Sequence, residues 1–345
     1  MASIIRTSTY LVLILLAALA SSPKITAAVI DDAADLMNQQ AQEKDELNDM
    51  RQEMGDLRST MGDAIKGLDR VRAQTAAARN AKEVHLIVKE APWEVSPGAS
   101  TDVLTYNGQQ PGPVIRCREG EQVKIVVHNE LKAPTSMYFH GMILPHAVSG
   151  LPRKEAGIIN PGQSYAFQFI APAAGTYWYH PQVTQCDQQA KGLCGVIVVE
   201  PASAPKTYEK DVVLVLGATS VPAKTGGRVT YYTVNGKSAP AIPPIEVHNG
   251  ERIRLRLLNV SDVAFPLHLS GHKMEVVAVN GSSSIEPHVM RDTLTVQPGE
   301  RYDVEVVANN PGVWSLSSVL PSQTSNGGKF PGGIAVVVRY PEELR

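Results

Sequence analysis

Residues 106–129 read YNGQQPGPVIRCREGEQVKIVVHN, a stretch with the composition of short β-strands divided by turns. It opens on Asn107-Gly108, a strong turn signal, and closes on the β-branched run QVKIVVHN. Similar runs, divided by Gly and Pro, continue along most of the chain. We therefore expect an all-β chain after residue 82, with strands at HLIVKE, QVKIVVHN, YAFQFI, VIVVE, VVLVLG, IRLRLLN, MEVVAVN, TLTVQ, YDVEVVAN and IAVVVRY.

Parts of this pattern occur twice in the same order. Tyr106-Asn107-Gly108 is repeated as Val234-Asn235-Gly236, and His128-Asn129 is repeated as Leu258-Asn259. Repetition of this kind indicates one duplicated domain, and the length suits two β-sandwiches. We expect the first sandwich at residues 83–203 and the second at residues 204–345, because the stretch PASAPK at residues 201–206 has the composition of a linker.

The first residues have the features of an export signal. Arg6 precedes an apolar run from Tyr10 to Ala20, and A-x-A cleavage sequences follow. We expect residues 1–28 to be a signal peptide and the protein to be secreted or periplasmic. A membrane anchor is the alternative, but a span needs about twenty apolar residues and this run is shorter. No transmembrane anchor is therefore expected in the mature chain.

Residues 29–82 contain no proline and are rich in Ala, Gln and charged residues, which predicts a helical segment. Apolar side chains recur in it at steps of three and four, as in a coiled-coil seam. We expect a coiled coil that makes the protein a homo-oligomer, whereas packing of the helix within its own chain is the alternative. The residues of this seam are Leu47, Met50, Met54, Leu57, Met61, Ala64, Leu68 and Val71.

Charge and cysteine content narrow the classes of partner. Lys and Arg number 32 against 34 Asp and Glu, and the formal net charge of -2 gives no reason to expect nucleic acid as a partner. Three cysteines are too few for a disulfide scaffold. Cys186 and Cys194 remain open as a disulfide, as free core thiols or as a soft-metal clip, and Cys117 is the third thiol.

Several motifs carry a family resemblance. TSMYFHGM, INPGQSYAFQF and GTYWYHPQVTQCDQQAKGLCGVIVVEP resemble the first cupredoxin domain of multicopper oxidases. PIEVHNGERIRLRLLN and FPLHLSGHKMEVVAVNG resemble their copper-bearing final domain. The chain thus resembles a two-domain multicopper oxidase of the laccase or copper nitrite reductase type. The resemblance implies two Greek-key cupredoxin sandwiches in a homotrimer, with a trinuclear copper cluster between the domains of neighbouring subunits.

Few imidazoles remain at the positions where the resemblance implies copper ligands. At the trinuclear positions the sequence keeps His140, His180 and His268, while Tyr138, Gln182 and Ser270 stand where the family has further histidines. At the type 1 position the family uses a cysteine thiolate and imidazoles, which are the donors that hold such a copper ion. Here the aligned residues are Phe265, Ser318 and Gln323.

We therefore expect no catalytic residues and no firmly bound cofactor, so that the protein is not an active multicopper oxidase but an exported binding or scaffold protein. The alternative is a residual copper-binding protein, or a weak copper-dependent oxidoreductase, with a metal site made of His140, His180 and His268. Without metal, these histidines would be hydrogen-bonded residues of a polar interface. His146 and His272 are expected to be polar or capping residues.

Overall fold

A computed structural model describes residues 81–341 except 147, 149–156, 183–187, 204–205 and 282–287, together with scattered positions between 32 and 66. The predicted signal peptide and residues 342–345 lie outside the described residues. The chain divides after Ala77 into two units, and the second unit contains the described strands.

The described positions between residues 32 and 66 are helical, with a continuous run at residues 54–63. In this run Met54, Leu57 and Met61 are 58%, 64% and 59% exposed. No helix among the described residues is long and apolar enough to cross a membrane. The other seam residues, Leu47, Met50, Ala64, Leu68 and Val71, lie outside the described residues.

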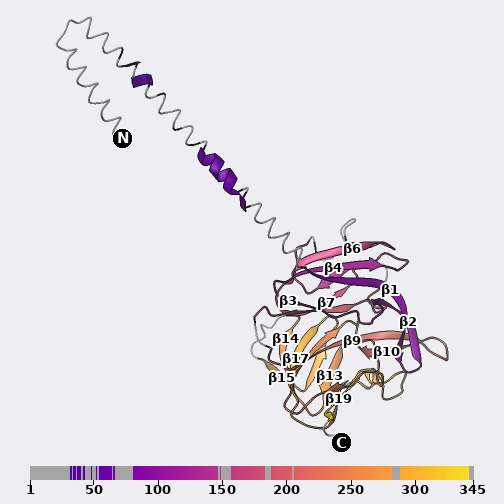
Figure 1. Cartoon of the computed structure of the whole chain (residues 1–345). Coiled ribbons are helices and arrows are strands. Elements are labelled where there is room, and N and C mark those ends of the chain that lie inside the picture. The colour runs from indigo at the N-terminus through magenta and orange to yellow at the C-terminus, as the bar shows by residue number, and fades with distance from the viewer. Residues whose placement is uncertain are drawn as a thin grey trace, which may run out of the picture. The chain divides into compact units, whose positions relative to one another are not determined.

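The first half of the strand region is a sandwich of two four-stranded sheets (Figure 1). One sheet has the order β2-β1-β4-β6, in which β1 and β4 are parallel. The other has the order β3-β8-β7-β5, in which β3 and β8 are parallel. The strands are β1 (Lys82–Ser96), β2 (Ala99–Tyr106), β3 (Ile115–Arg118), β4 (Gln122–Asn129), β5 (Tyr138–His140), β6 (Ser164–Ile170), β7 (Gly175–His180) and β8 (Gly195–Glu200).

The second half is a larger sandwich, with sheets ordered β10-β9-β12-β17-β14-β15 and β11-β19-β18-β13-β16. Its elements are β9 (Lys210–Pro222), β10 (Arg228–Val234), β11 (Ile245–Glu246), β12 (Arg252–Asn259), β13 (Phe265–Leu269), β14 (Met274–Val279), β15 (Val289–Arg291), β16 (Thr293–Val296), β17 (Arg301–Val307), β18 (Val313–Ser318), the 3-10 turn η1 (Pro321–Gln323) and β19 (Ala335–Arg339). The expected all-β class and all ten predicted strands are confirmed.

Matching asparagines show the equivalence of the two sandwiches. Asn107 and Asn235 both adopt positive φ, 57° and 50°, which suits the asparagine of a tight hairpin turn. The Asn107 Oδ1 accepts from the backbone N–H of Ile87 at 2.6 Å, and the Asn235 Oδ1 accepts from that of Val215 at 2.8 Å. Each side chain therefore ties the turn after the second strand of a hairpin to the first strand of that hairpin, as expected of a duplicated domain.

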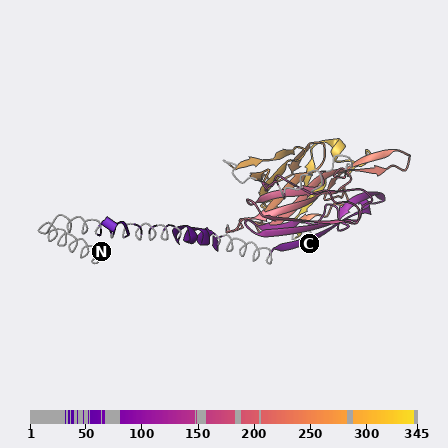
Figure 2. The same cartoon turned by 90° about the horizontal axis from the view of Figure 1, so that it is seen from above.

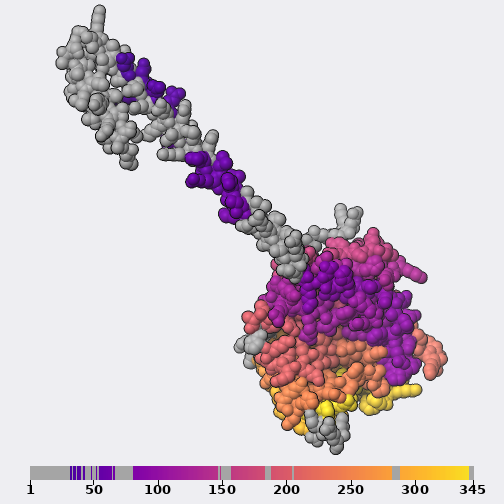
Figure 3. Space-filling view, in the orientation of Figure 1, coloured from indigo at the N-terminus to yellow at the C-terminus, as the bar shows by residue number. Residues whose placement is uncertain are grey.

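The two sandwiches adjoin in the space-filling view (Figure 3), and buried apolar residues form a layer between them that is separate from their own cores. The layer contains Trp178 and Val198 of the first sandwich and Val215 and Leu258 of the second, all buried. The β1–β2 and β9–β10 hairpins also lie side by side in both views (Figure 1, Figure 2), and β2 contacts β9. Burial of apolar surface at about 25 cal/mol per Å² stabilises this arrangement.

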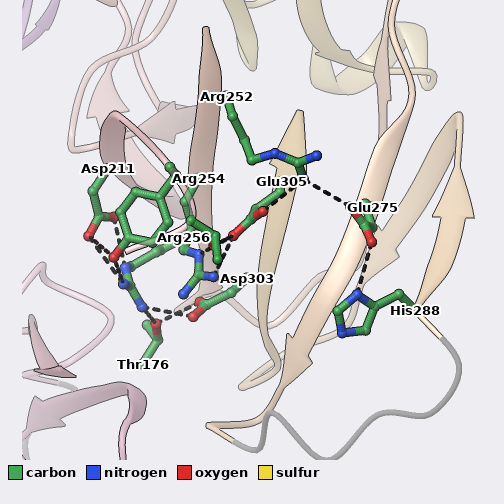
Figure 4. A network of polar contacts seen from close by, with 11 residues as sticks. Thr176, Asp211, Arg252, Arg254, Arg256, Glu275, His288, Asp303 and Glu305 are labelled. Atoms are coloured by element: carbon green, nitrogen blue, oxygen red, sulfur yellow. Dashed lines mark hydrogen bonds and ion pairs between the residues drawn. The ribbon is translucent and has the colours of Figure 1, made fainter. Parts of the chain in front are cut away.

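A buried charge network joins the sandwiches beside the apolar layer (Figure 4). Arg256, 3% exposed, donates to Asp211 at 2.8 Å and to Asp303 at 2.7 Å. It also donates at 2.8 Å to the hydroxyl of Thr176, which belongs to the first sandwich. Burial raises the pKa of Asp211, but Arg256 and Arg116 outweigh it and hold this pKa below its usual value. The network therefore fixes the orientation of one sandwich on the other.

Candidate functional site

His140 and His180 lie together because β5 and β7 are antiparallel neighbours in which Tyr138 pairs with His180 and His140 with Trp178. The His140 Nδ1 is 3.3 Å from the His180 Nε2. Both imidazoles pack against the indole of Trp178, with ring centroids 4.7 Å and 4.1 Å apart. Two of the three histidines predicted from the sequence therefore form one cluster.

The hydrogen bonds of the pair decide which ring nitrogens are free. The His180 Nδ1 lies 2.8 Å from the carbonyl oxygen of Pro181, which only accepts, so this nitrogen donates. In the neutral ring the His180 Nε2 is then an acceptor, and the facing His140 Nδ1 donates to it. The His140 Nε2 makes no hydrogen bond to a described residue, so it is the one lone pair that the pair leaves free.

Burial keeps both imidazoles neutral. It lowers the pKa of His140 to about 4, assisted by the neighbouring His180 and by the charge of Arg301. Burial also lowers the pKa of His180. The hydrogen bond to Pro181 raises this pKa, but by less than burial lowers it. At neutral pH both rings therefore have lone pairs but no charge.

Arg301, at the start of β17, brings a positive charge to this cluster and was not anticipated from the sequence. It is 4% exposed, and its Nη2 donates to the carbonyl of Asn280 at 2.8 Å. A Cβ on Gly141, next to His140, would collide with the Arg301 guanidinium, so the two sandwiches approach closely here. The Nε of Arg301 is buried and has no hydrogen-bond partner among the described residues. Nothing in the sequence around residue 301 indicates this long-range contact.

His268, the third predicted histidine, lies on β13 in the second sandwich. Its Nδ1 is 2.8 Å from the carbonyl oxygen of Asp292 and therefore donates to it. His268 lines a cavity with His272, whereas His180 lines a different cavity. Within one chain, His268 is thus not part of the cluster of His140 and His180. The expected meeting of the three across subunits stays a prediction.

The residues at the implied type 1 position form a closed polar pair beside a phenyl ring. The Ser318 Oγ donates to the Gln323 Oε1 at 2.6 Å, and the Gln323 Nε2 donates to the carbonyl of Ala264 at 2.9 Å. Both side chains are 5% exposed, and Phe265 is completely buried in the apolar core. The backbone N–H of Leu320 also donates to the Ser318 Oγ, at 3.2 Å.

Other candidate ligands have structural roles. The His272 Nε2 lies 2.7 Å from the hydroxyl of Tyr340, and its Nδ1 lies 3.2 Å from the carbonyl of Ser270. Cys117 and Cys194 are free, buried thiols, and burial raises the pKa of Cys194 to about 12. Cys186 lies outside the described residues. Among the residues that the structure describes, no three His, Cys, Asp or Glu side chains are grouped to hold a metal ion.

Comparisons with known proteins agree with the fold and its order. Two sequence profiles of the multicopper oxidase family match the chain, one at residues 87–204 and the other at residues 206–340. The multicopper oxidase MmcO of Mycobacterium tuberculosis is 29% identical over 294 residues, which cover 73% of this chain and 57% of that protein. A copper resistance protein A homolog of Pseudomonas syringae pv. tomato is 28% identical, over 68% of this chain and 48% of that protein. The chain thus spans about half the length of the curated relatives that it matches.

Solved structures give the same result. The blue copper oxidase of Nitrosomonas europaea is 30% identical, with a TM-score of 0.71, and the match covers 76% of this chain and 87% of that one. The multicopper oxidase mgLAC is also 30% identical, with a TM-score of 0.70 over the same shares. The profiles, the relatives and the paired sandwiches together show that this chain belongs to the multicopper oxidase family.

Proposed function

We propose that this protein is an exported member of the family that binds or organises other molecules and does not reduce dioxygen with copper. The observation that carries the proposal is the 2.6 Å hydrogen bond between Ser318 and Gln323. A type 1 copper ion needs a thiolate and imidazoles, whereas a hydroxyl, an amide and the ring of Phe265 supply neither. The donors at this position do not fit that ion.

The pair of His140 and His180 supports the same proposal. One imidazole nitrogen of the pair is free, which is far fewer donors than a trinuclear copper cluster requires. The guanidinium of Arg301 lies close enough to lower the pKa of His140, and its charge opposes a second cation at the same place. A bound metal ion would have to overcome this repulsion.

The test is copper content after loading. Purified full-length protein is incubated with cupric ion, freed of excess metal and assayed for copper per chain, visible absorption and oxidation of a phenol. We expect less than about 0.1 copper per chain, no thiolate-to-copper absorption and no oxidase activity. Intense visible absorption, or oxygen consumption with the phenol, would overturn the proposal.

A residual copper site is the second candidate, and one observation favours it. The Nε2 atoms of His140 and His268 make no hydrogen bond to a described residue, so both lone pairs are open to a ligand. If neighbouring subunits bring them together, they form the core of a mononuclear site. About one copper per chain, lost in both His140→Ala and His268→Ala, would establish this candidate instead.

Export and trimeric assembly belong to the same proposal. The charged start, the apolar run and the A-x-A sequences of residues 1–28 support export to a secreted or periplasmic location. The exposed Met54, Leu57 and Met61 support association of helices from several chains. Mass measurement of the mature protein, with sequencing of its first residues, tests both.

A further inference from the structure

A cavity of about 460 Å³ lies between the two sandwiches, apart from the type 1 position. Its volume falls in the range of small-molecule sites, about 300–1,000 Å³. His180 is at its wall, but the hydrogen bonds of that imidazole run to Pro181 and His140. The cavity therefore adjoins the pair of His140 and His180, and Gln182, at an implied trinuclear position, also lines it.

Gly217 on β9 creates the hollow. It pairs with Thr233 of β10, and both residues lie on the sheet face that meets the first sandwich. A Cβ on Gly217 would lie 3.1 Å from the Thr233 Oγ1 and 3.7 Å from the Val260 Cγ2. A Cβ at position 217 would thus be in tight contact with the Thr233 hydroxyl, and a side chain there would reduce the space that Gly217 leaves in the lining. Val215, two residues earlier, packs in the apolar layer.

Hydrogen bonds between the two sandwiches, and within the first one, fix the residues that form the cavity walls. The Gln189 Nε2 donates to the carbonyl of Val260 at 3.2 Å, and the Trp93 Nε1 donates to the carbonyl of Gly236 at 2.7 Å. Gln188 is fixed at both ends of its amide, accepting from Thr135 at 2.7 Å and donating to Pro134 at 3.0 Å. The cavity is thus formed before any ligand enters, which reduces the entropy lost on binding.

One lining side chain has a buried atom without a partner. The Gln110 Oε1 is buried and has no hydrogen-bond partner among the described residues. Buried polar groups are nearly always paired, so this oxygen indicates a donor supplied from inside the cavity. Thr219 and Thr233, which are 6% and 2% exposed, add hydroxyl-bearing side chains to the same wall.

The charge of the lining restricts the ligand. Among the described residues that line the cavity, Asp262 is the one with a formal charge, and none is Lys or Arg. Phosphates and carboxylates would therefore find no cation here. Amides and hydroxyls both donate and accept, and the matching chemistry is that of a neutral molecule with many hydroxyl groups. We propose that this cavity binds a small neutral polyhydroxylated ligand, a monosaccharide or disaccharide.

The test uses saturation-transfer NMR on the full-length protein with glucose, maltose, sucrose and myo-inositol, each at about 10 mM. Glucose 6-phosphate is the charged comparison. We expect saturation transfer to at least one neutral compound, and weaker or absent transfer to glucose 6-phosphate, because the described lining offers an anion and no cation. No transfer to any neutral compound, or stronger binding of the phosphate, would overturn the proposal.

Variants place the binding in the cavity. Gly217→Val fills the hollow and should weaken binding at least about tenfold. Thr233→Val removes one hydroxyl at nearly constant shape and should weaken binding about three- to tenfold, the effect of one neutral hydrogen bond. Thr230→Val removes an exposed hydroxyl from the same strand and should leave the affinity unchanged. If Gly217→Val fails to fold, the comparison of Thr233→Val with Thr230→Val decides; equal affinity of these two variants contradicts the assignment.

Discussion

Ser318 and Gln323 satisfy one another in the interior of the second sandwich, five residues apart and on either side of the entry into η1. Polar side chains in a core are costly unless paired, and each polar atom of these two side chains has a partner. The position where the family resemblance implies a type 1 copper ion thus holds an internal hydrogen-bond network.

Replacement of one member of this pair should therefore be more harmful than replacement of both. Gln323→Leu leaves the Ser318 O–H without its acceptor and the Ala264 carbonyl without the amide donor, and should cost about 2 kcal/mol of unfolding free energy. In the double variant with Ser318→Ala, part of this loss should be recovered, because one orphaned group is gone. Urea unfolding of the two single variants and the double variant measures the coupling, and strictly additive losses would contradict it.

Copper ligands can also be introduced at the implied type 1 position. The triple variant Phe265→His, Ser318→Cys, Gln323→His supplies the thiolate and imidazoles that a type 1 copper ion requires. We expect it to acquire intense visible absorption on addition of cupric ion, while Ser318→Cys alone does not. Copper titration followed by absorption and electron paramagnetic resonance checks this. A folded triple variant without such a signal would mean that the alignment of these three positions with the copper ligands is wrong.

Arg256 is expected to be the most sensitive charged residue of the domain interface. In Arg256→Met, Asp211 and Asp303 lose their shared guanidinium, and a broken buried ion pair costs about 3–5 kcal/mol. Arg339→Met is the matched control, since its pair with Glu246 is solvent-exposed and such pairs contribute about 0–1 kcal/mol. Chemical denaturation of both variants gives the comparison. Equal losses would show that the buried network does not hold the sandwiches together.

Local sequence patterns predicted ten strands correctly, because turn asparagines and β-branched runs determine the conformation of the few residues around them. The run ASTDVLTY of β2 escaped prediction, since its Ser, Thr and Asp weaken the apolar signal. The adjacency of His140 and His180 followed from the family resemblance. The contact of Arg301 with Gly141 and the hollow over Gly217 depend on how two distant segments pack, and no nearby residue signals either.

The His140 imidazole should make stability depend on pH below neutrality. Its folded pKa of about 4 lies below the unfolded value of about 6.5, so the unfolded chain binds the proton first as pH falls. Stability from this group is thus complete above about pH 6.5 and is lost progressively towards about pH 4. His140→Gln removes this titration. Its loss of unfolding free energy between about pH 7 and pH 4.5 should be smaller than that of the parent by about 2 kcal/mol.

The exposed His85 offers the control for this measurement. His85→Gln removes an exposed imidazole from the surface of β1, so it serves as the comparison for the replacement of a histidine as such. Urea unfolding at the two pH values, with all three proteins in the same buffers, provides the data. If His140→Gln keeps the full pH dependence of the parent, the buried neutral imidazole is not its source.

The helical seam should determine the oligomeric state. Met54→Asp with Met61→Asp places carboxylates where a coiled coil buries apolar side chains, and unpaired charges are strongly disfavoured there. We expect light scattering to show a lower mass than the trimer proposed for the parent. The control is Gln52→Asp with Ser59→Asp, which adds the same charge to exposed positions of the same segment outside the seam, and its mass should match that of the parent. If both double variants keep the parental mass, the sandwiches alone hold the assembly; if both lose it, added charge rather than the seam is responsible.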